Sequence, residues 1–121
     1  MHELGIVVKV LEQVDALAKE YGAEKILKVT MEVGEVSSIV PDLFTDAFDW
    51  AKKKTDFARE AELEMILIEG RTYCQTCGET YKTTDHGKKC PHCGSYDTYL
   101  LTGDQVVIKD IGAVFSEPDP T

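Results

Sequence analysis

Residues 74–94, CQTCGETYKTTDHGKKCPHCG, contain every cysteine of the chain and determine how its middle can fold. The cysteines form two Cys-x-x-Cys pairs with twelve residues between them: Cys74, Cys77, Cys90 and Cys93. Two such pairs at this separation are typical of a tetrahedral site in which four thiolates hold one zinc ion. Gly78 and Gly94 each follow a pair and supply the positive φ that a turn around the metal commonly needs. We therefore predict a structural Zn²⁺ site at the four cysteines.

Two alternatives to a purely structural zinc site remain open at this stage. Dithiol redox chemistry prefers one Cys-x-x-Cys at the start of a helix, but the residues after the second pair, SYDTY, show no helical periodicity. Metal sensing or exchange is the other alternative, because His86 or His92 could replace a thiolate if the coordination changed. We expect both histidines to be solvated residues of the loop.

Around this motif, residues 71–102 are rich in Cys, Thr, Tyr, Lys and Gly and poor in large aliphatic residues. Such a composition cannot build an apolar core, so the stretch needs a cross-link such as a metal ion or a disulfide to fold. On its amino-terminal side, apolar residues from Leu4 to Tyr21 recur with a period near 3.6, and Gly22 stands where a helix would end. This pattern predicts a helix from Leu4 to the residue before Gly22.

Three further segments have the patterns of strands and one that of a helix. In 24–34, Ile26, Lys28, Thr30 and Glu32 alternate with Leu27, Val29, Met31 and Val33, which predicts a strand with one covered face. Residues 61–70 and 104–115 are the second and third candidate strands. A helix is predicted from Pro41, a residue that suits the first helical position. Its predicted buried face consists of Leu43, Phe44, Ala47, Phe48 and Ala51.

These segments predict an α+β fold in which a small sheet of about three strands packs with two helices. In the simplest layout the third strand returns to the sheet of the first two. The domain then comprises residues 1–70 and 103–117, and residues 71–102 form an inserted zinc-ribbon-like subdomain. A terminal appendage is the alternative, and residues 118–121 are expected to be a flexible tail.

The charge of the chain limits its partners. With 22 acidic and 13 basic residues, the formal net charge is −9. An acidic chain disfavours nucleic acid and anionic membrane surfaces as partners and favours a basic protein, a cation or a metal. No apolar run is long enough to span a membrane, and the first twenty residues lack the pattern of a secretory leader. We therefore expect a cytoplasmic protein.

The opening MHEL places a histidine directly behind the amino terminus. The simplest interpretation is a surface residue ahead of a helix. However, the amine of Met1, the amide nitrogen of residue 2 and the imidazole of His2 are spaced to close two fused chelate rings on one metal. Such a set of nitrogens favours the square-planar geometry of Ni(II) and Cu(II) over zinc. Glu3 could add its amide nitrogen, a carboxylate oxygen or a proton acceptor.

Taken together, these features resemble the HypA/HybF family of nickel metallochaperones. The similarity is carried by MHELGIV at the start, VTMEVGEVSSIVPDLFTDAFDWA at 29–51, the two cysteine motifs and QVVIKDI at 105–111. The resemblance implies that His2 binds nickel with the Met1 amine, backbone amides and Glu3, and that zinc occupies the four cysteines. Two residues depart from the family pattern. The family usually has serine where this chain has Gly5, and often an acidic residue where it has Val40.

The resemblance also implies a function and partners. Nickel would be handed to a hydrogenase large-subunit precursor, and in some bacteria to urease maturation proteins, alongside the GTPase HypB. Binding to that GTPase would use the first helix or the acidic surface. The chain is expected to be a monomer or a weak homodimer.

Three other functional classes are weighed against nickel delivery. The main alternative is a zinc-ribbon module that binds proteins and carries no labile metal. A nucleic-acid binder should present a basic, aromatic face, but the tyrosines here, Tyr73, Tyr81, Tyr96 and Tyr99, are expected to pack on the sides of a small sheet. An enzyme is disfavoured because a zinc with four thiolates has no open position for water. The alternating Glu60, Glu62 and Glu64 are expected to form one solvated face.

Overall fold

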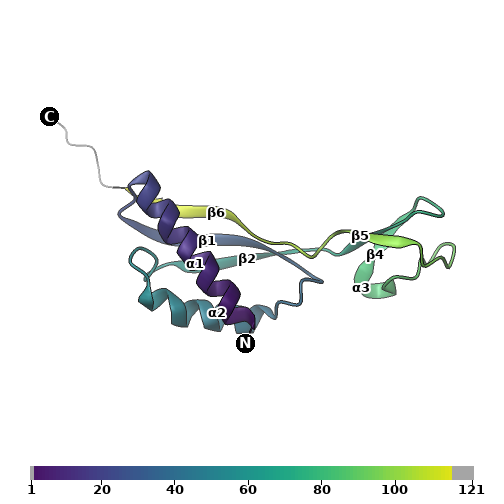
Figure 1. Cartoon of the computed structure of the whole chain (residues 1–121), viewed down its shortest axis with the longest axis horizontal. Helices are drawn as coiled ribbons and strands as arrows, with labels where there is room; N and C mark the ends of the chain where they lie inside the picture. Colours follow the sequence, from purple (N-terminus) through teal and green to yellow (C-terminus); the bar gives the residue numbers. More distant parts are fainter. Residues whose placement is uncertain (1, 116–121) are drawn as a thin grey trace. The chain divides into compact units, whose positions relative to one another are not determined.

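The computed structural model describes residues 2–115, and of residue 2 only the backbone. Its elements along the chain are α1 (His2–Tyr21), β1 (Lys25–Gly34), α2 (Pro41–Ala51), the 3₁₀ turn η1 (Lys52–Lys54), β2 (Glu62–Ile68), β3 (Arg71–Cys74), β4 (Thr80–Lys82), α3 (Thr83–His86), β5 (Thr98–Thr102) and β6 (Val106–Val114) (Figure 1). The predicted α+β class is confirmed. The predicted tail at 118–121 lies outside the described residues.

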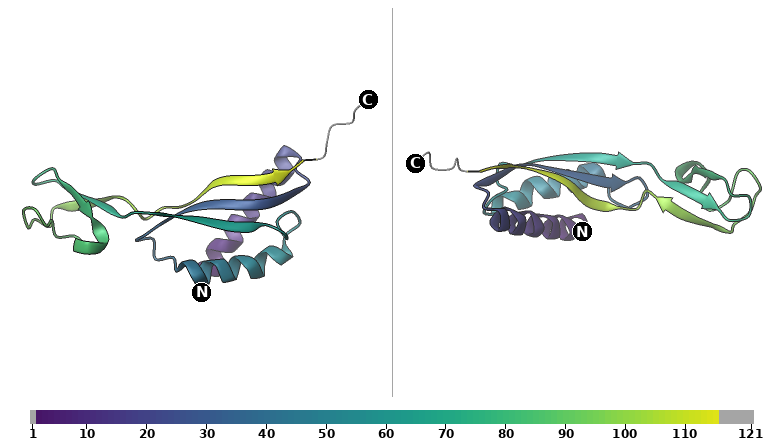
Figure 2. Two further views of the ribbon diagram at one scale, coloured as in Figure 1. Left: turned by 180° about the vertical axis from the view of Figure 1, so that it is seen from behind. Right: turned by 90° about the horizontal axis from the view of Figure 1, so that it is seen from above.

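The first sheet has the strand order β2-β1-β6. The last strand therefore returns to pair with the first, as predicted. Helices α1 and α2 lie on the same face of this sheet (Figure 2). The core between them is formed by fully buried side chains of α1, β1 and α2: Val7, Val14, Val29, Met31, Phe44 and Phe48. Burying each of the larger of these side chains stabilises the fold by roughly 1.5–3 kcal/mol.

Helix α1 starts earlier than the sequence predicts and ends where it predicts. It begins at His2 instead of Leu4. At its end, Gly22 has φ +72°, and the N–H of Ala23 donates to the carbonyl of Ala18 over 2.8 Å. A left-handed glycine and this backward hydrogen bond are typical of a Schellman motif, which satisfies the last helical carbonyls.

Helix α2 begins at Pro41, as predicted, but buries a narrower face than expected. Phe44, Phe48 and Ala51 are buried. The prediction was wrong for Leu43, whose side chain is 47% exposed, and for Ala47, which is half-buried. These two residues lie on a second stripe of the helix, beside α1 instead of under the sheet.

Strand β1 changes the phase of its alternation once. Val29, Met31 and Val33 are buried, as expected for one covered face, but Thr30, which was expected on the opposite face, is buried too. Ile26 is buried as well, whereas Leu27 is 42% exposed and Lys28 is exposed too. The prediction that Leu27 shares a face with Val29 was therefore wrong, because two consecutive side chains point outward between the two buried stretches.

The second sheet has the order β4-β3-β5, and Cys74 is the last residue of its central strand. Both pairings are antiparallel: Tyr73 lies opposite Thr80 on β4 and opposite Tyr99 on β5. Register shifts once, between Arg71 and Thr72 on β3. Its buried cluster holds only Cys74, Tyr81 and Cys90. This sheet thus has almost no apolar core of its own, in agreement with the composition of the stretch.

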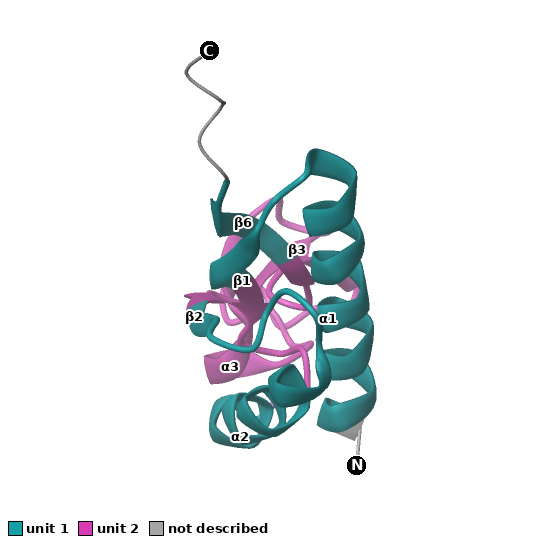
Figure 3. Cartoon of the chain, turned by 90° about the vertical axis from the view of Figure 1, so that its left-hand side faces the viewer, with its two compact units in different colours: residues 1–31, 40–65, 108–121 teal, residues 32–39, 66–107 magenta. Residues whose placement is uncertain are grey.

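The chain divides into two compact units (Figure 3). Unit 1 comprises the residues up to Met31, Val40–Met65 and the residues from Ile108 onward, and unit 2 comprises Glu32–Ile39 and Ile66–Val107. The domain boundaries expected from the sequence, with an insertion at 71–102, stay a prediction. No helix in the part of the chain that the structure describes is long and apolar enough to cross a membrane.

Unit 2 contains a close backbone junction built on three glycines. A Cβ on Gly34 would lie 1.9 Å from the carbonyl oxygen of Gly103, and a Cβ on Gly103 would lie 2.4 Å from the Cα of Gly70. Hydrogen bonds of 2.7 Å from Gly34 N to Gln105 O and 2.8 Å from Val36 N to Gly103 O close the junction. Only glycine allows backbones to approach this closely.

Candidate metal centre

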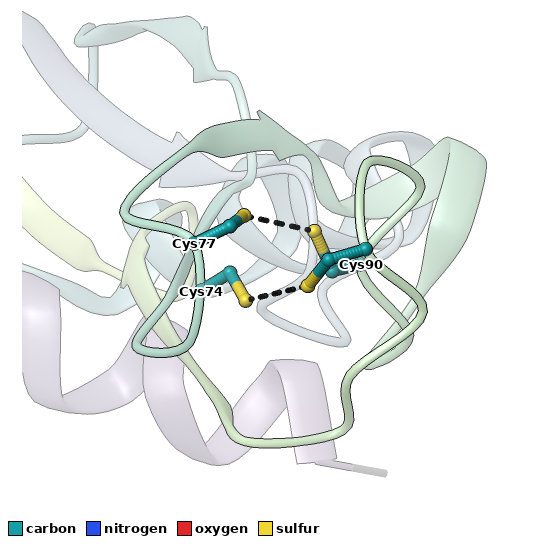
Figure 4. Close-up of side chains that lie close together, drawn as sticks. Cys74, Cys77 and Cys90 are labelled. Carbon is teal, nitrogen blue, oxygen red and sulfur yellow. Dashed lines mark hydrogen bonds between the residues drawn. The ribbon is translucent and has the colours of Figure 1, made fainter.

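The four cysteine sulfurs converge on one point (Figure 4). The Sγ atoms of Cys74 and Cys93 lie 3.6 Å apart, as do those of Cys77 and Cys90, and all four lie within 4.8 Å of one another. A zinc ion bound tetrahedrally at about 2.3 Å requires sulfurs about 3.8 Å apart. The four thiols and their spacing therefore fit a tetrathiolate metal ion.

Each cysteine pair is folded into the same type of turn. In the first, the N–H of Cys74 donates to Glu79 O over 2.9 Å, and the N–H of Gly78 donates to Cys74 O over 2.9 Å. The second repeats this pattern from Cys90, with hydrogen bonds Cys90 N to Ser95 O at 2.9 Å and Gly94 N to Cys90 O at 2.8 Å. Gly78 and Gly94 have φ values of +77° and +76°. The predicted positive φ of both glycines is confirmed.

A hydrogen bond between side chains joins the two turns, and it was not predicted from the sequence. The hydroxyl oxygens of Thr76 and Ser95 lie 2.8 Å apart. Thr98 donates its hydroxyl to Lys88 O over 2.7 Å, which fastens the loop before Cys90 to β5. The signal in the sequence was a hydroxyl residue at the third position of the first Cys-x-x-Cys motif, Thr76, and another just after Gly94 of the second, Ser95. These two contacts tie the cysteine turns to each other and to β5 in addition to the sulfur cluster.

The two members of each pair differ in exposure, and those of the first pair also differ in the pKa of their thiols. Cys74 and Cys90 are buried, whereas Cys77 and Cys93 are exposed. The backbone N–H of Cys77 is the main cause that lowers the pKa of the Cys74 thiol to about 7. At Cys77 the N–H of Glu79 lowers the pKa, but burial and the neighbouring thiols together outweigh it and raise the pKa to about 12. Cys74 is thus stabilised as a thiolate, the form that binds metal.

None of the histidines and tyrosines of unit 2, all of which lie in the described part of the chain, belongs to the group of potential metal ligands. Neither His86 nor His92 belongs to the group of potential metal ligands in the described residues, and both are exposed. Tyr73 and Tyr99 pack against each other with ring centroids 5.4 Å apart, and Tyr81 is buried. The prediction that the tyrosines pack on the sheet was wrong for one of them, because the side chain of Tyr96 is 71% exposed.

The glutamates around β2 form a solvated face, as predicted. Glu60, Glu62 and Glu64 are all exposed. Glu60 lies 2.9 Å from the Nζ of Lys25, and Glu64 pairs with Lys28. Glu60 and Glu64 are therefore engaged in surface ion pairs, and the three carboxylates do not belong to any group of potential metal ligands among the described residues.

The amino-terminal candidates are described only in part. Met1 and the side chain of His2 lie outside the described residues, so the predicted set of nickel ligands stays a prediction. Helix α1 begins at His2, of which only the backbone is described. Glu3 is half-buried and lines a cavity with Leu4 of α1 and with Leu43 and Asp46 of α2.

Comparison with known proteins identifies the family. A family model described as "Hydrogenase/urease nickel incorporation, metallochaperone, hypA" matches residues 1–113. Proteins named hydrogenase maturation factor HypA are similar over 92% of this chain: that of Aquifex aeolicus is 32% identical over 96% of its own length, and that of Geobacter metallireducens 30% identical over 97%.

Two solution structures share the fold. That of the Ni metallochaperone HypA from Helicobacter pylori superposes with a TM-score of 0.72 at 21% identity and covers 94% of this chain and 98% of its own. A second HypA protein gives a TM-score of 0.73 at 24% identity and covers 96% and 98%.

The predicted resemblance is therefore confirmed over nearly the whole chain. The family consists of metallochaperones that serve as maturation factors, which also confirms that this is not an enzyme. The four-cysteine cluster is the metal-binding group that the structure describes. The chain belongs to the HypA family of nickel-incorporating metallochaperones of hydrogenase and urease maturation.

Proposed function

We propose that this chain binds Ni(II) at its amino terminus and delivers it to the large-subunit precursor of a hydrogenase in the cytoplasm, while Zn²⁺ occupies the four cysteines. The observation that carries the nickel proposal is the position of His2 in a member of this family, at the first residue of α1. The first N–H groups of a helix have no carbonyl partner within it, so the amides of residues 2 and 3 are free to serve a metal.

The nickel ligands follow from the chemistry of this terminus. The Met1 amine, the amide of residue 2 and the His2 imidazole form two fused chelate rings, and the amide or carboxylate of Glu3 completes the set. Loss of an amide proton creates a negative charge next to the positive end of the α1 dipole, which favours it. An array of nitrogens with amide ligands suits planar Ni(II).

The spacing of the four sulfur atoms supports zinc at the cysteines, because four thiolates complete the tetrahedral coordination that structural zinc prefers. Four thiolates leave no position for water, so this metal would fold unit 2 and not take part in exchange. The nickel site, in contrast, is assembled from groups that each take up a proton on release. Nickel can then leave one ligand at a time.

Delivery of nickel requires a client protein that receives the metal and a partner that supplies energy. No phosphate-binding loop occurs in this sequence, so energy coupling would come from a partner GTPase of the HypB type. The client would be a hydrogenase precursor, with urease maturation proteins as the second client class, in line with the description of the family.

Substitution of each of the three histidines tests the nickel site. We expect the zinc-loaded chain to bind one Ni(II) with the absorption band of planar nickel, His2→Ala to lose that band, and His86→Ala and His92→Ala to keep it. The affinity should fall steeply between neutral and mildly acidic pH, because the amine, imidazole and amides are protonated in the nickel-free protein. Equal binding by His2→Ala would reject His2 as a nickel ligand, and failure of the unsubstituted chain to bind nickel would support the alternative, a zinc-ribbon interaction module without labile metal.

A further inference from the structure

A groove runs between α1 and α2 in unit 1. It consists of two cavities, of about 390 and 310 Å³, that meet at Trp50 of α2. Leu4, Leu43 and Ala47 line the first, and Val8, Leu11 and Ala51 line the second. On the α1 side the lining extends from Glu3 to Asp15, which corresponds to about 18 Å of helix.

The floor and rim of the groove expose large apolar side chains. Trp50 is 54% exposed, Leu43 47% and Val8 40%. Such a contiguous apolar strip is unfavourable in water and typically marks a binding surface. Leu43, Ala47 and Trp50 share one stripe of α2, beside the stripe of Phe44, Phe48 and Ala51 that enters the core. The second stripe thus has no role in the core of unit 1.

The charged residues of the groove are mostly acidic. Four carboxylates line it: Glu3, Glu12, Asp15 and Asp46. The one ammonium group among the lining residues is that of Lys54, and its Nζ lies 4.1 Å from the centroid of the Trp50 ring. An apolar strip with acidic edges is complementary to an apolar segment with basic edges.

The same charges argue against two other occupants. A second copy of this chain that docked groove to groove would place like carboxylates opposite each other, because a two-fold interface repeats the same patch on both sides. A membrane surface is anionic and would be repelled by the acidic edges.

The shape of the groove selects the secondary structure of the segment. It lies between two helices and not along the edge of a sheet. An amphipathic helix docks into such a groove through apolar residues at i, i+3, i+4 and i+7. About 18 Å accommodates roughly twelve residues of helix.

We propose that the groove between α1 and α2 receives an amphipathic helix of a partner protein, apolar on the docked face and flanked by lysine or arginine. Only the role of this docking surface in nickel delivery rests on the proposed function, whereas the groove itself does not. The groove begins at the first turn of α1, so the bound helix would lie beside the proposed nickel site.

The single tryptophan of the chain allows a direct test, because Trp50 lies within the groove. The probe is a synthetic helical peptide with leucines at i, i+3, i+4 and i+7 and lysines on both flanks. Added to the zinc-loaded full chain at low salt, it should shift the Trp50 emission to shorter wavelength in a saturable manner. The same residues in scrambled order, or with glutamate in place of lysine, should bind at least about tenfold more weakly.

Two pairs of variants assign the binding to the groove. Leu43→Lys should weaken the peptide at least about tenfold, whereas Leu27→Lys, an exposed leucine on β1, should leave it unchanged. Asp46→Lys should weaken it more than Glu20→Lys, an exposed acidic residue of α1 that does not line the groove. No saturable shift, or equal binding of the basic and acidic peptides, would overturn the proposal. Self-association abolished by Leu43→Lys would also overturn it in favour of a second copy.

Nickel titration separates this proposal from the proposed function. Leu43→Lys and Asp46→Lys should keep the nickel stoichiometry of the native chain. Failure of the native chain to bind nickel, with peptide binding intact, would reject the nickel site and leave the groove standing.

Discussion

The sulfur atoms of Cys74 and Cys93, nineteen positions apart in the sequence, lie 3.6 Å from each other. Because the buried cluster around them holds only Cys74, Tyr81 and Cys90, little apolar burial opposes the unfolding of unit 2. A structural zinc ion can contribute about 10–16 kcal/mol to folding in small domains. The folding of unit 2 should therefore depend on its metal.

Replacing a buried cysteine should uncouple the two units. We expect Cys90→Ser to lower zinc affinity more than about 100-fold, since even substitutions outside the ligand shell cost 10–100-fold. Amide NMR signals of β3–β5 should lose their dispersion, while those of α1 and the core of unit 1 persist. His92→Ala is the matched control, because His92 is exposed in the same turn. If His92→Ala also lost zinc, the four-sulfur assignment would be incorrect.

The Lys25–Glu60 pair should leave a pH signature. The hydrogen bond from Lys25 at 2.9 Å lowers the pKa of Glu60 below its ordinary 4.5, and Glu60 in turn raises the pKa of Lys25 above 10.5. The contribution of Glu60 is present above pH 4.5 and is lost as the pH falls through its lowered pKa, and that of Lys25 is lost above pH 10.5. The contribution of this ion pair to the stability of the fold is small, because both side chains are exposed.

Carboxylate NMR titration measures this effect directly. Lys25→Met should return the pKa of Glu60 toward its usual value, and Lys9→Met on α1 should not. An unchanged Glu60 pKa in Lys25→Met would show that the ion pair does not form in solution.

The glycine junction of unit 2 should not tolerate a side chain. Gly34→Ala would place a Cβ 1.9 Å from Gly103 O, so we expect it to lower the free energy of unfolding by more than about 2 kcal/mol. Gly5→Ala in α1 meets nothing within 4 Å and should stabilise the chain by about 0.5–1 kcal/mol. Denaturant unfolding of both variants and of the unsubstituted chain measures these changes in the free energy of unfolding. Equal effects of the two substitutions would contradict the close approach.

Adjacent residues of α2 should differ sharply in their contribution to stability. Phe44→Ala removes a fully buried ring and should cost about 3–5 kcal/mol, whereas Leu43→Ala on the exposed stripe should cost less than about 1 kcal/mol. Thermal unfolding of unit 1 measures both. A large loss in Leu43→Ala would mean that Leu43 is a core residue, and the groove would then be part of the packing.

The parts of the structure that follow from local patterns could be predicted from the sequence. The spacing of the cysteines and their following glycines predicted both turns of the metal centre, because each turn is closed within a few residues. Gly22 and Pro41 likewise marked helix boundaries by their own backbone preferences.

The parts that depend on contacts far apart in the chain could not be predicted. Leu43 has the same hydrophobicity as a core residue, and only the position of α1 decides that it lines a groove. Leu27 breaks the alternation of β1 because two consecutive residues face outward there, which periodicity cannot show. The junction of Gly34 with Gly103 joins segments that lie far apart in the sequence.

The most direct test of the account is a Ni(II) titration, by calorimetry and visible absorption, of the zinc-loaded chain that begins at Met1 and of the same chain with Gly-Ser-Gly ahead of Met1. The extension removes the amine from the chelate but leaves every side chain in place. The account predicts one planar nickel per chain in the first protein and its loss in the second. Equal binding in both would contradict a nickel site at the amino terminus.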